Sequence, residues 1–274
     1  MREYLNKISL TKNDRGIYSL DTSIGCSSGT KDNKNGCYND CYAAKSAKLY
    51  GYDFTKTVYR YFENKKHERD IVKQIDNIPL PFVRIGTSGD PSENWEHTLS
   101  VLKVISKSNK EIVIITKHWN NLTVEQCIEI SKMNVCINTS VSALDKQPLL
   151  LNSLEQYKLL KNYCKSALRI VSCDFNKENE EGKMLAKIQE NIFKNENIID
   201  TVLRLNKSNP LIKNGIVNIT KSKFLGKNAL ISKFNRKTYL GKCSTCSEMC
   251  GVNIINNISH LENRRPLTIQ TKLL

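Results

Sequence analysis

Short apolar runs alternate with longer stretches of helical periodicity along most of the chain. Six runs rich in β-branched and aliphatic residues predict strands, and the segments between them repeat apolar residues every three or four positions, as amphipathic helices do. The predicted strands cover residues 16–24, 81–89, 111–117, 134–141, 167–173 and 201–206. The predicted helices begin near residue 42 and cover 92–108, 123–133, 149–164 and 178–193.

The alternation of strand and helix predicts a parallel sheet that is covered by helices. The strands are nearly continuous apolar runs, which is typical of strands buried on both faces. We therefore expect an α/β fold, a partial (βα)6 TIM-like barrel over residues 1–206. Residues 207–274 would then form a small, basic, cysteine-rich C-terminal extension.

Polar residues collect where the predicted strands end. The carboxyl ends of parallel strands meet at one face of an α/β barrel, and that face carries the active site in such barrels. We therefore expect a functional site there. The polar residues are Thr87 to Asp90, Thr116 and Lys117, Asn138 to Ser140, and Ser172.

Ten cysteines among 274 residues need an explanation. The first twelve residues contain no continuous apolar segment like that of a secretory signal, and no stretch approaches the roughly 20 apolar residues of a membrane span. We therefore expect a cytoplasmic protein with no membrane partner, in a compartment where disulfides are rare. Six cysteines lie in two short segments, which points to metal binding. Cys127, Cys136, Cys164 and Cys173 are scattered, as expected of small core residues.

The first cysteine cluster lies in the segment Gly25 to Ala43, which reads GCSSGTKDNKNGCYNDCYA. Cys26, Cys37 and Cys41 follow the first predicted strand in a loop rich in Gly, Asn and Ser. Three thiolates in a flexible loop can surround one iron–sulfur cluster and leave one iron open. Zinc is the alternative, although a structural zinc site has four ligands.

The segment resembles the cluster motif of the radical S-adenosylmethionine (SAM) superfamily, whose usual spacing is C-x-x-x-C-x-x-C. Here ten residues separate the first two cysteines and three separate the second and third. The ending Cys41-Tyr42-Ala43 is similar to phage-associated radical SAM-like proteins with a G-C…G-C-x-x-C-Y-A motif. The resemblance implies a 4Fe–4S cluster that binds SAM, over roughly residues 17–206. It further implies SAM contacts at Tyr42, Gly86, Thr87, Ser88, Gly89, Asp90, Lys117, Asn138 and Ser140.

Three more cysteines, Cys243, Cys246 and Cys250, stand within eight residues of one another. Such a dense trio favours a metal site. Radical SAM enzymes often carry an auxiliary cluster after the barrel, so the resemblance implies a second iron–sulfur cluster. Zinc is the alternative, and it needs a fourth ligand, such as His260 or one of the scattered cysteines.

The net charge of +15 is unevenly distributed. Residues 207–274 carry 12 Lys and Arg against two acids, giving +10, and residues 1–206 carry 30 against 25, giving +5. A basic end favours a polyanionic partner, with nucleic acid first. The alternative is a lysine-rich proteome, which the many Lys, Asn and Ile residues also indicate. Among the four histidines, only His118 lies near the predicted site, and we expect a surface or capping role for it.

These patterns and the resemblance predict a radical SAM enzyme that cleaves SAM to generate a 5′-deoxyadenosyl radical, with a nucleic acid or nucleotide as substrate. The resemblance also implies an electron donor such as flavodoxin or ferredoxin. Two alternatives stay open. One is a peptide- or protein-modifying radical SAM enzyme with an auxiliary cluster, and the other is a non-catalytic, zinc-stabilised nucleic-acid-binding protein.

Overall fold

One mixed sheet of nine strands organises the computed structural model, which describes residues 6–32 and 37–254. The strand order is β1-β2-β5-β6-β7-β8-β9-β11-β10, and β3 and β4 form a separate antiparallel pair. The strands are β1 (Thr11–Lys12), β2 (Tyr18–Ser19), β3 (Ser23–Ile24), β4 (Val58–Tyr59), β5 (Phe82–Ile85), β6 (Glu111–Thr116), β7 (Val135–Val141), β8 (Lys165–Ser172), β9 (Ile198–Leu205), β10 (Thr220–Phe224) and β11 (Lys227–Ser232).

The middle of the sheet consists of six parallel strands, β2 and β5 to β9. Each of the six predicted strand regions overlaps one of them, although β8 and β9 begin two and three residues earlier than predicted. The predicted α/β fold with a parallel sheet is therefore confirmed. In the described part of the chain, no pairing joins the outer strands β1 and β10. Among the described residues, the sheet is therefore open between β1 and β10.

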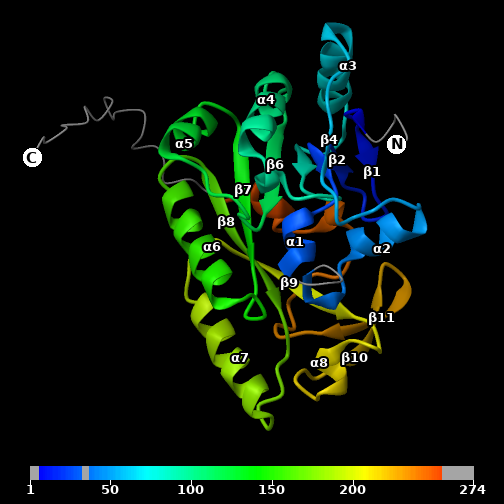
Figure 1. Cartoon of the computed structure of the whole chain (residues 1–274), viewed down its shortest axis with the longest axis vertical. Helices are drawn as coiled ribbons and strands as arrows, with labels where there is room; N and C mark the ends of the chain where they lie inside the picture. Colours follow the sequence, from blue (N-terminus) through cyan, green and yellow to red (C-terminus); the bar gives the residue numbers. More distant parts are fainter. Residues whose placement is uncertain (1–5, 33–36, 255–274) are drawn as a thin grey trace, which may run out of the picture.

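Helices cover the outer side of the parallel strands. Figure 1 shows α5, α6 and α7 along one flank, while α1 and α2 lie across the sheet from them, next to β11. The helices are α1 (Ser27–Asp32), α2 (Tyr42–Leu49), α3 (Lys65–Asp76), α4 (Trp95–Ile105), α5 (Val124–Ile130), α6 (Gln147–Leu160), α7 (Glu180–Ile192) and α8 (Pro210–Lys213). The described residues also form the short 3₁₀ helices η2 (Cys37–Asn39), η3 (Pro91–Glu93), η4 (Cys243–Thr245) and η5 (Met249–Gly251).

Side-chain caps define where the outer helices begin. The Asn94 side chain accepts a hydrogen bond from the backbone N–H of His97 at the start of α4, and Asn179 does the same for Gly182 in α7. Thr123 and Gln126 form a reciprocal capping box at α5. Because each cap satisfies backbone donors that have no partner within the helix, the helices begin at defined residues.

The largest apolar cluster lies between the sheet and α3, α4 and α5. Trp95, Leu99, Leu102 and Ile105 all point into this core, as their helical spacing predicts. The scattered cysteines are free and buried, which agrees with a core role. Cys127 and Cys164 belong to this first cluster, Cys173 to a second one and Cys136 to a third.

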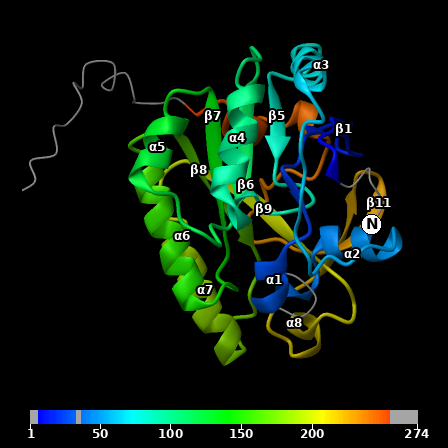
Figure 2. The same cartoon turned by 45° about the horizontal axis from the view of Figure 1, so that its top comes forward.

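The extension after residue 206 contributes strands to the same sheet. Strand β11 pairs antiparallel with β9, with Leu230 opposite Leu205, and β10 continues the sheet from β11. The following segment returns to the interior, where η5 contacts β7 and β8. There the carbonyl oxygen of Cys250 accepts a hydrogen bond from Asn138 (2.9 Å) and that of Val252 accepts one from Lys165 (3.3 Å). Figure 2 shows this segment, in orange, beside β7.

His118 is fully buried, so the expected surface or capping role is wrong. Its Nε2 lies 3.0 Å from the Thr139 hydroxyl, and its Nδ1 has no hydrogen-bond partner among the described residues. Burial lowers the pKa of His118 to about 3. Separately, none of the helices in the described part of the chain is both long and apolar enough to cross a membrane.

Acid should destabilise the protein through His118. Its pKa is lower in the folded chain, so between about pH 3 and 6.5 the unfolded chain binds more protons and stability falls with falling pH. The contribution amounts to about 2 kcal/mol between pH 7 and 5. We expect His118→Gln to remove it, as measured by urea unfolding at both pH values. Above pH 7.5 the two proteins should respond to pH alike, and an equal acid loss in both would contradict the assignment.

Candidate functional site at the carboxyl ends of the strands

A cavity of about 660 Å³ opens at the carboxyl ends of the parallel strands. Its walls come from the cysteine loop, from the ends of β5 to β9, and from β11. A volume of this size falls in the range typical of small-molecule and cofactor sites. Residues from all of these segments line it, among them Cys26, Cys37, Cys41, Tyr42, Phe54, Gly86, Thr87, Lys117, Trp119, Ser140, Thr201, Arg204, Lys207 and Asn228.

The buried carboxylate of Asp21 holds the glycine-rich loop in place. It accepts hydrogen bonds from the backbone N–H groups of Gly86 (3.0 Å), Thr87 (2.7 Å) and Ser88 (2.9 Å). Gly86 has φ +90°, and a Cβ there would lie 2.1 Å from the carbonyl oxygen of Ile115. Only glycine fits this close approach, so the loop conformation depends on Gly86 and Asp21 together.

A second buried carboxylate, Asp90, joins neighbouring strand ends. It accepts hydrogen bonds from the Thr116 hydroxyl (2.7 Å), the backbone N–H of Lys117 (2.8 Å) and that of Ser92 (2.9 Å). Burial raises the pKa of Asp90, although these hydrogen bonds oppose the rise. The contacts tie the loop after β5 to the end of β6, which fixes two walls of the cavity.

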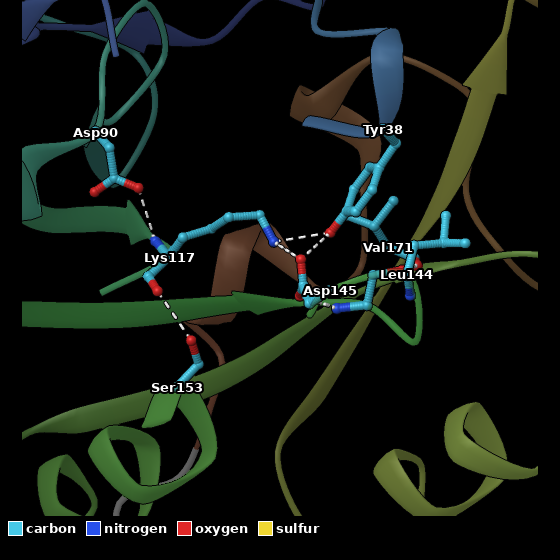
Figure 3. A network of polar contacts seen from close by, with 8 residues as sticks. Tyr38, Asp90, Lys117, Leu144, Asp145, Ser153 and Val171 are labelled. Carbon is cyan, nitrogen blue, oxygen red and sulfur yellow. Dashed lines mark hydrogen bonds and ion pairs between the residues drawn. The ribbon is translucent and has the colours of Figure 1, made fainter. Parts of the chain in front are cut away.

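Lys117 takes part in a buried polar network, which Figure 3 shows from close by. Its Nζ lies 2.6 Å from the Asp145 carboxylate and 2.8 Å from the Tyr38 hydroxyl, which itself donates to Asp145 at 2.7 Å. Burial lowers the pKa of Lys117, but Asp145 and Cys37 outweigh it and hold the pKa above its usual value. Lys117 is therefore a fixed cation on the cavity wall.

The three N-terminal cysteines reach the cavity from separate short segments. Cys26 follows β3, Cys37 opens η2, and Cys41 stands at the N-cap of α2. All three are free, half-buried and in the cavity wall. Burial raises the pKa of Cys37 to about 11, and Lys117 opposes that rise. Among the described residues, no three His, Cys, Asp or Glu side chains lie in metal-binding geometry. The three thiols therefore line one cavity but do not converge on a single metal position.

The donor set around this space fits an iron–sulfur cluster. Three thiols with a nearby fixed cation are the groups that stabilise such a cluster. Glu93 lies next to them: its Oε1 accepts hydrogen bonds from Ser28 N–H (2.9 Å) and from the Cys26 thiol (3.7 Å). Its Oε2 accepts one from the Ser27 hydroxyl at 2.7 Å. Glu93 thus orients the start of α1, where Cys26 stands.

Most of the predicted SAM-contacting residues share this cavity. The Tyr42 hydroxyl also donates a hydrogen bond to the Thr87 carbonyl oxygen. Ser88 stands outside the cavity lining, and its backbone N–H donates to Asp21. The residues on the cavity wall are Tyr42, Gly86, Thr87, Gly89, Asp90, Lys117 and Ser140.

Asn138 lies in a lower layer of the interior, which is nearer than the cavity to the amino-terminal ends of the parallel strands. It shares a strand face with Ser140, but it stands two residues nearer the start of β7, about 7 Å lower along the strand. Its side-chain amide donates to the Cys250 carbonyl oxygen, and it is fully buried. The predicted role of Asn138 as a SAM contact therefore does not match its place in the structure.

The C-terminal cysteines line a second, smaller chamber in this lower layer. Its volume is about 50 Å³, and Cys243, Cys246 and Cys250 all open onto it. Cys243 and Cys250 are buried, and Cys246 is half-buried. His260, which the sequence offers as a fourth metal ligand, falls outside the described residues.

Sequence patterns missed several residues that shape the site. Asp21 and Glu93 are isolated acids with no motif around them, and only the folded chain brings them to backbone N–H groups and to Cys26. The contribution of β11 to the cavity wall was also missed. The available signal was the short apolar run from Ala229 to Ile231.

Comparisons with known proteins show similarity of fold. No protein-family model and no curated protein matches the chain. The cobalamin-dependent S-adenosylmethionine radical enzyme OxsB, solved with aqua-cobalamin and S-adenosylmethionine, superposes with a TM-score of 0.45 at 12% identity, over 84% of this chain and 40% of that one. A spore photoproduct lyase variant, solved with AdoMet and dinucleoside spore photoproduct, gives 0.52 at 9% identity, over 86% and 74%. This chain therefore has the mixed α/β fold of spore photoproduct lyase.

Proposed function

We propose that the chain is a radical SAM enzyme, in which Cys26, Cys37 and Cys41 hold a 4Fe–4S cluster and SAM binds beside it. One observation carries the proposal: three thiols from separate segments open into the same cavity as the glycine-rich loop Gly86 to Asp90. This cavity lies on the face where α/β barrels perform their chemistry. The shared fold with a lyase solved with AdoMet supports the same assignment.

The cofactor carries the difficult chemistry, and the chain positions it. Held by Cys26, Cys37 and Cys41, a reduced cluster would supply the electron for cleavage of the SAM sulfonium, and thereby the 5′-deoxyadenosyl radical. Lys117 stabilises the thiolate form of Cys37, which a metal requires. Asp21 and Asp90 hold the strand-end loops rigid, and Phe54 and Trp119 add apolar cover to the cavity wall. We expect the electron to come from a donor such as flavodoxin or ferredoxin.

Replacing Cys26, Cys37 and Cys41 together with Ala should remove about four irons per chain, as expected for one 4Fe–4S cluster. The measurement is iron and sulfide analysis after anaerobic purification. Cys173→Ala is the control, because Cys173 is also free but lies in an apolar cluster and outside the cavity lining. Unchanged iron in the triple variant would contradict the cluster. Zinc in place of iron would favour the non-catalytic nucleic-acid-binding alternative.

Ser140→Ala should weaken SAM binding about tenfold, because Ser140 lines the cavity and a lost hydrogen bond to a charged ligand costs about 1.5 kcal/mol. Calorimetry with the reconstituted protein measures the affinity. Ser88→Ala is the matched control, since Ser88 stands beside the cavity but outside its lining. If both variants bind SAM like the unmodified protein, SAM does not lie against β7.

The charge beside the cavity supports a proposal for the substrate class. Strand β11 lines the cavity through Asn228, Ala229 and Leu230. In the hairpin that contains it, the exposed Lys221 and Lys223 stand opposite the cavity-lining Leu230 and Asn228, and Lys227 is exposed at the turn. We therefore favour a nucleic acid or nucleotide-bearing substrate, whose phosphates such a hairpin attracts. The dinucleoside bound to spore photoproduct lyase is consistent with this class.

Replacing these three hairpin lysines with Gln should weaken nucleic-acid binding and lower the slope of log affinity against log salt by up to about three. Salt titrations with single-stranded DNA, duplex DNA and RNA measure both quantities. The control variant carries Gln at Lys158, Lys183 and Lys187, which are exposed on α6 and α7 and change the net charge equally. Equal effects of the two variants would show that general charge, not the hairpin, causes binding. Binding of acidic peptide alone would favour the peptide-modifying alternative.

A further inference from the structure

We infer that the lower chamber is an oxyanion site, in which arginines from three strands and one turn bind a phosphate group. The inference rests on the proposed function, since it concerns the substrate of the larger cavity at the strand ends. The arginines that line the chamber are Arg15, Arg84, Arg169 and Arg204. Arg84, Arg169 and Arg204 lie on β5, β8 and β9, and Arg15 lies in the turn between β1 and β2.

The chamber wall carries an excess of positive charge. Among the described residues that line it, the four arginines face two carboxylates, Asp200 and Glu248. None of the arginines forms an ion pair within 4.0 Å in the described part of the chain. Burial raises the pKa of Glu248, which disfavours its charged form. At least two positive charges therefore remain, and a phosphate monoester, with a charge of about −1.5 to −2 at pH 7, matches them.

Other groups in the wall do not supply the missing negative charge. Asp200 accepts hydrogen bonds from the hydroxyls of Ser172 (2.5 Å) and Thr238 (2.6 Å), so both of its oxygens already have partners. Free thiols are mostly protonated at neutral pH. Burial raises the pKa of Cys243 in the chamber wall, so its thiol stays neutral. The charge that balances the arginines has to come from a bound anion.

The arginine side chains also have hydrogen-bond donors to spare. A guanidinium carries five N–H donors in a planar fork that fits a phosphate. Arg169 donates to the Thr201 hydroxyl at 2.9 Å, but its buried Nε has no partner among the described residues. Arg84 donates to the Thr87 hydroxyl over 3.3 and 3.4 Å. Because a buried donor without an acceptor is costly, an oxyanion that accepts from these groups is bound favourably.

Two of the cations lie on the same aromatic ring. The guanidinium carbons of Arg15 and Arg204 are 5.2 and 4.5 Å from the centre of the Phe224 ring. The ring attracts both cations but adds no net negative charge. Burial lowers the pKa of Arg204, and the neighbouring Arg15 lowers it further. An anion beside both side chains relieves this repulsion, which favours its binding.

The size of the chamber favours a group of a few atoms. Its volume is about 50 Å³, whereas one water needs about 10–15 Å³ and a cofactor site typically about 300–1,000 Å³. A phosphate group therefore fits, but the nucleoside attached to it does not. Thr201, Val202 and Arg204 line both the chamber and the larger cavity. A nucleotide whose nucleoside lies in the larger cavity thus has a place for its phosphate next to it.

Calorimetry of the full-length chain, purified anaerobically and exchanged into phosphate-free buffer, tests the site. Inorganic phosphate should bind, and Arg169→Met should weaken its binding about tenfold or more, as expected for a lost hydrogen bond to a charged group. Arg69→Met on α3 is the matched control, because it removes the same charge from an exposed position outside both walls. Equal phosphate affinity of the two variants, or no binding by the unmodified protein, overturns the inference.

The four ribonucleoside 5′-monophosphates and their nucleosides separate two sources of the phosphate group. If it belongs to the substrate, at least one monophosphate should bind about tenfold more tightly than both its nucleoside and inorganic phosphate, and Arg169→Met should remove this difference. Inorganic phosphate that binds through Arg169 without such a preference identifies a site for the free ion. Iron and sulfide analysis of the same sample tests the proposed SAM cluster separately, so either idea can fail alone.

Arg204→Met keeps the test decisive if Arg169→Met fails to fold. Arg204 is exposed, and its side chain donates no hydrogen bond to another described residue. Phosphate should raise the Tm of the unmodified protein above that in chloride of equal ionic strength, because a ligand of the folded state stabilises it. The rise should be smaller in Arg204→Met and unchanged in Arg69→Met. An equal rise in both variants overturns the inference.

The C-terminal thiols provide a last check. A metal held by Cys243, Cys246 and Cys250 would occupy the chamber in place of phosphate. Metal analysis before and after replacing these three residues with Ala decides between the two occupants. An unchanged metal content agrees with the oxyanion site, whereas loss of iron or zinc overturns it.

Discussion

The open ends of parallel strands leave backbone N–H groups that need acceptors, and this need shapes the whole upper face of the protein. Asp21 and Asp90 meet it by placing carboxylates beneath the loops that follow β5 and β6. Each carboxylate accepts several hydrogen bonds from these donors, and these bonds offset part of the cost of burying its charge. The cavity walls are rigid as a consequence, and the Cys26 loop, Lys117 and Ser140 are positioned relative to them.

The sequence was sufficient to predict the central fold but not the edges of the sheet. Six apolar runs identify the six parallel strands, because strands buried on both faces carry a strong local signal. The β10–β11 hairpin lacks that signal, since Lys221 and Lys223 are exposed and only Ile231 and Ser232 are buried. The placement of β11 against β9 depends on pairing with a strand that lies far away in the sequence, which no local pattern encodes.

The residues of the candidate site could likewise be predicted only in part from the sequence. Cys26, Cys37 and Cys41 were found from clustering and resemblance, and strand-end polarity located Lys117 and Ser140. The expectation for Asn138 did not match the structure. The alternation of side chains along a strand predicts the face of the sheet on which a residue lies, but not its distance from the cavity along the strand. Asp21 and Glu93 could not be found, because a single acid carries meaning only once tertiary structure brings it to N–H groups or a thiol.

The β10–β11 hairpin at the end of the sheet affects how one molecule of the protein meets another. An unpaired strand edge is a template for pairing with a second chain, and long flat apolar edges promote aggregation. Here β10 forms one outer edge and exposes Lys221 and Lys223 along it. Like charges on that edge repel a second copy that approaches in register. The hairpin therefore works against pairing between the parallel strands behind it and those of another molecule.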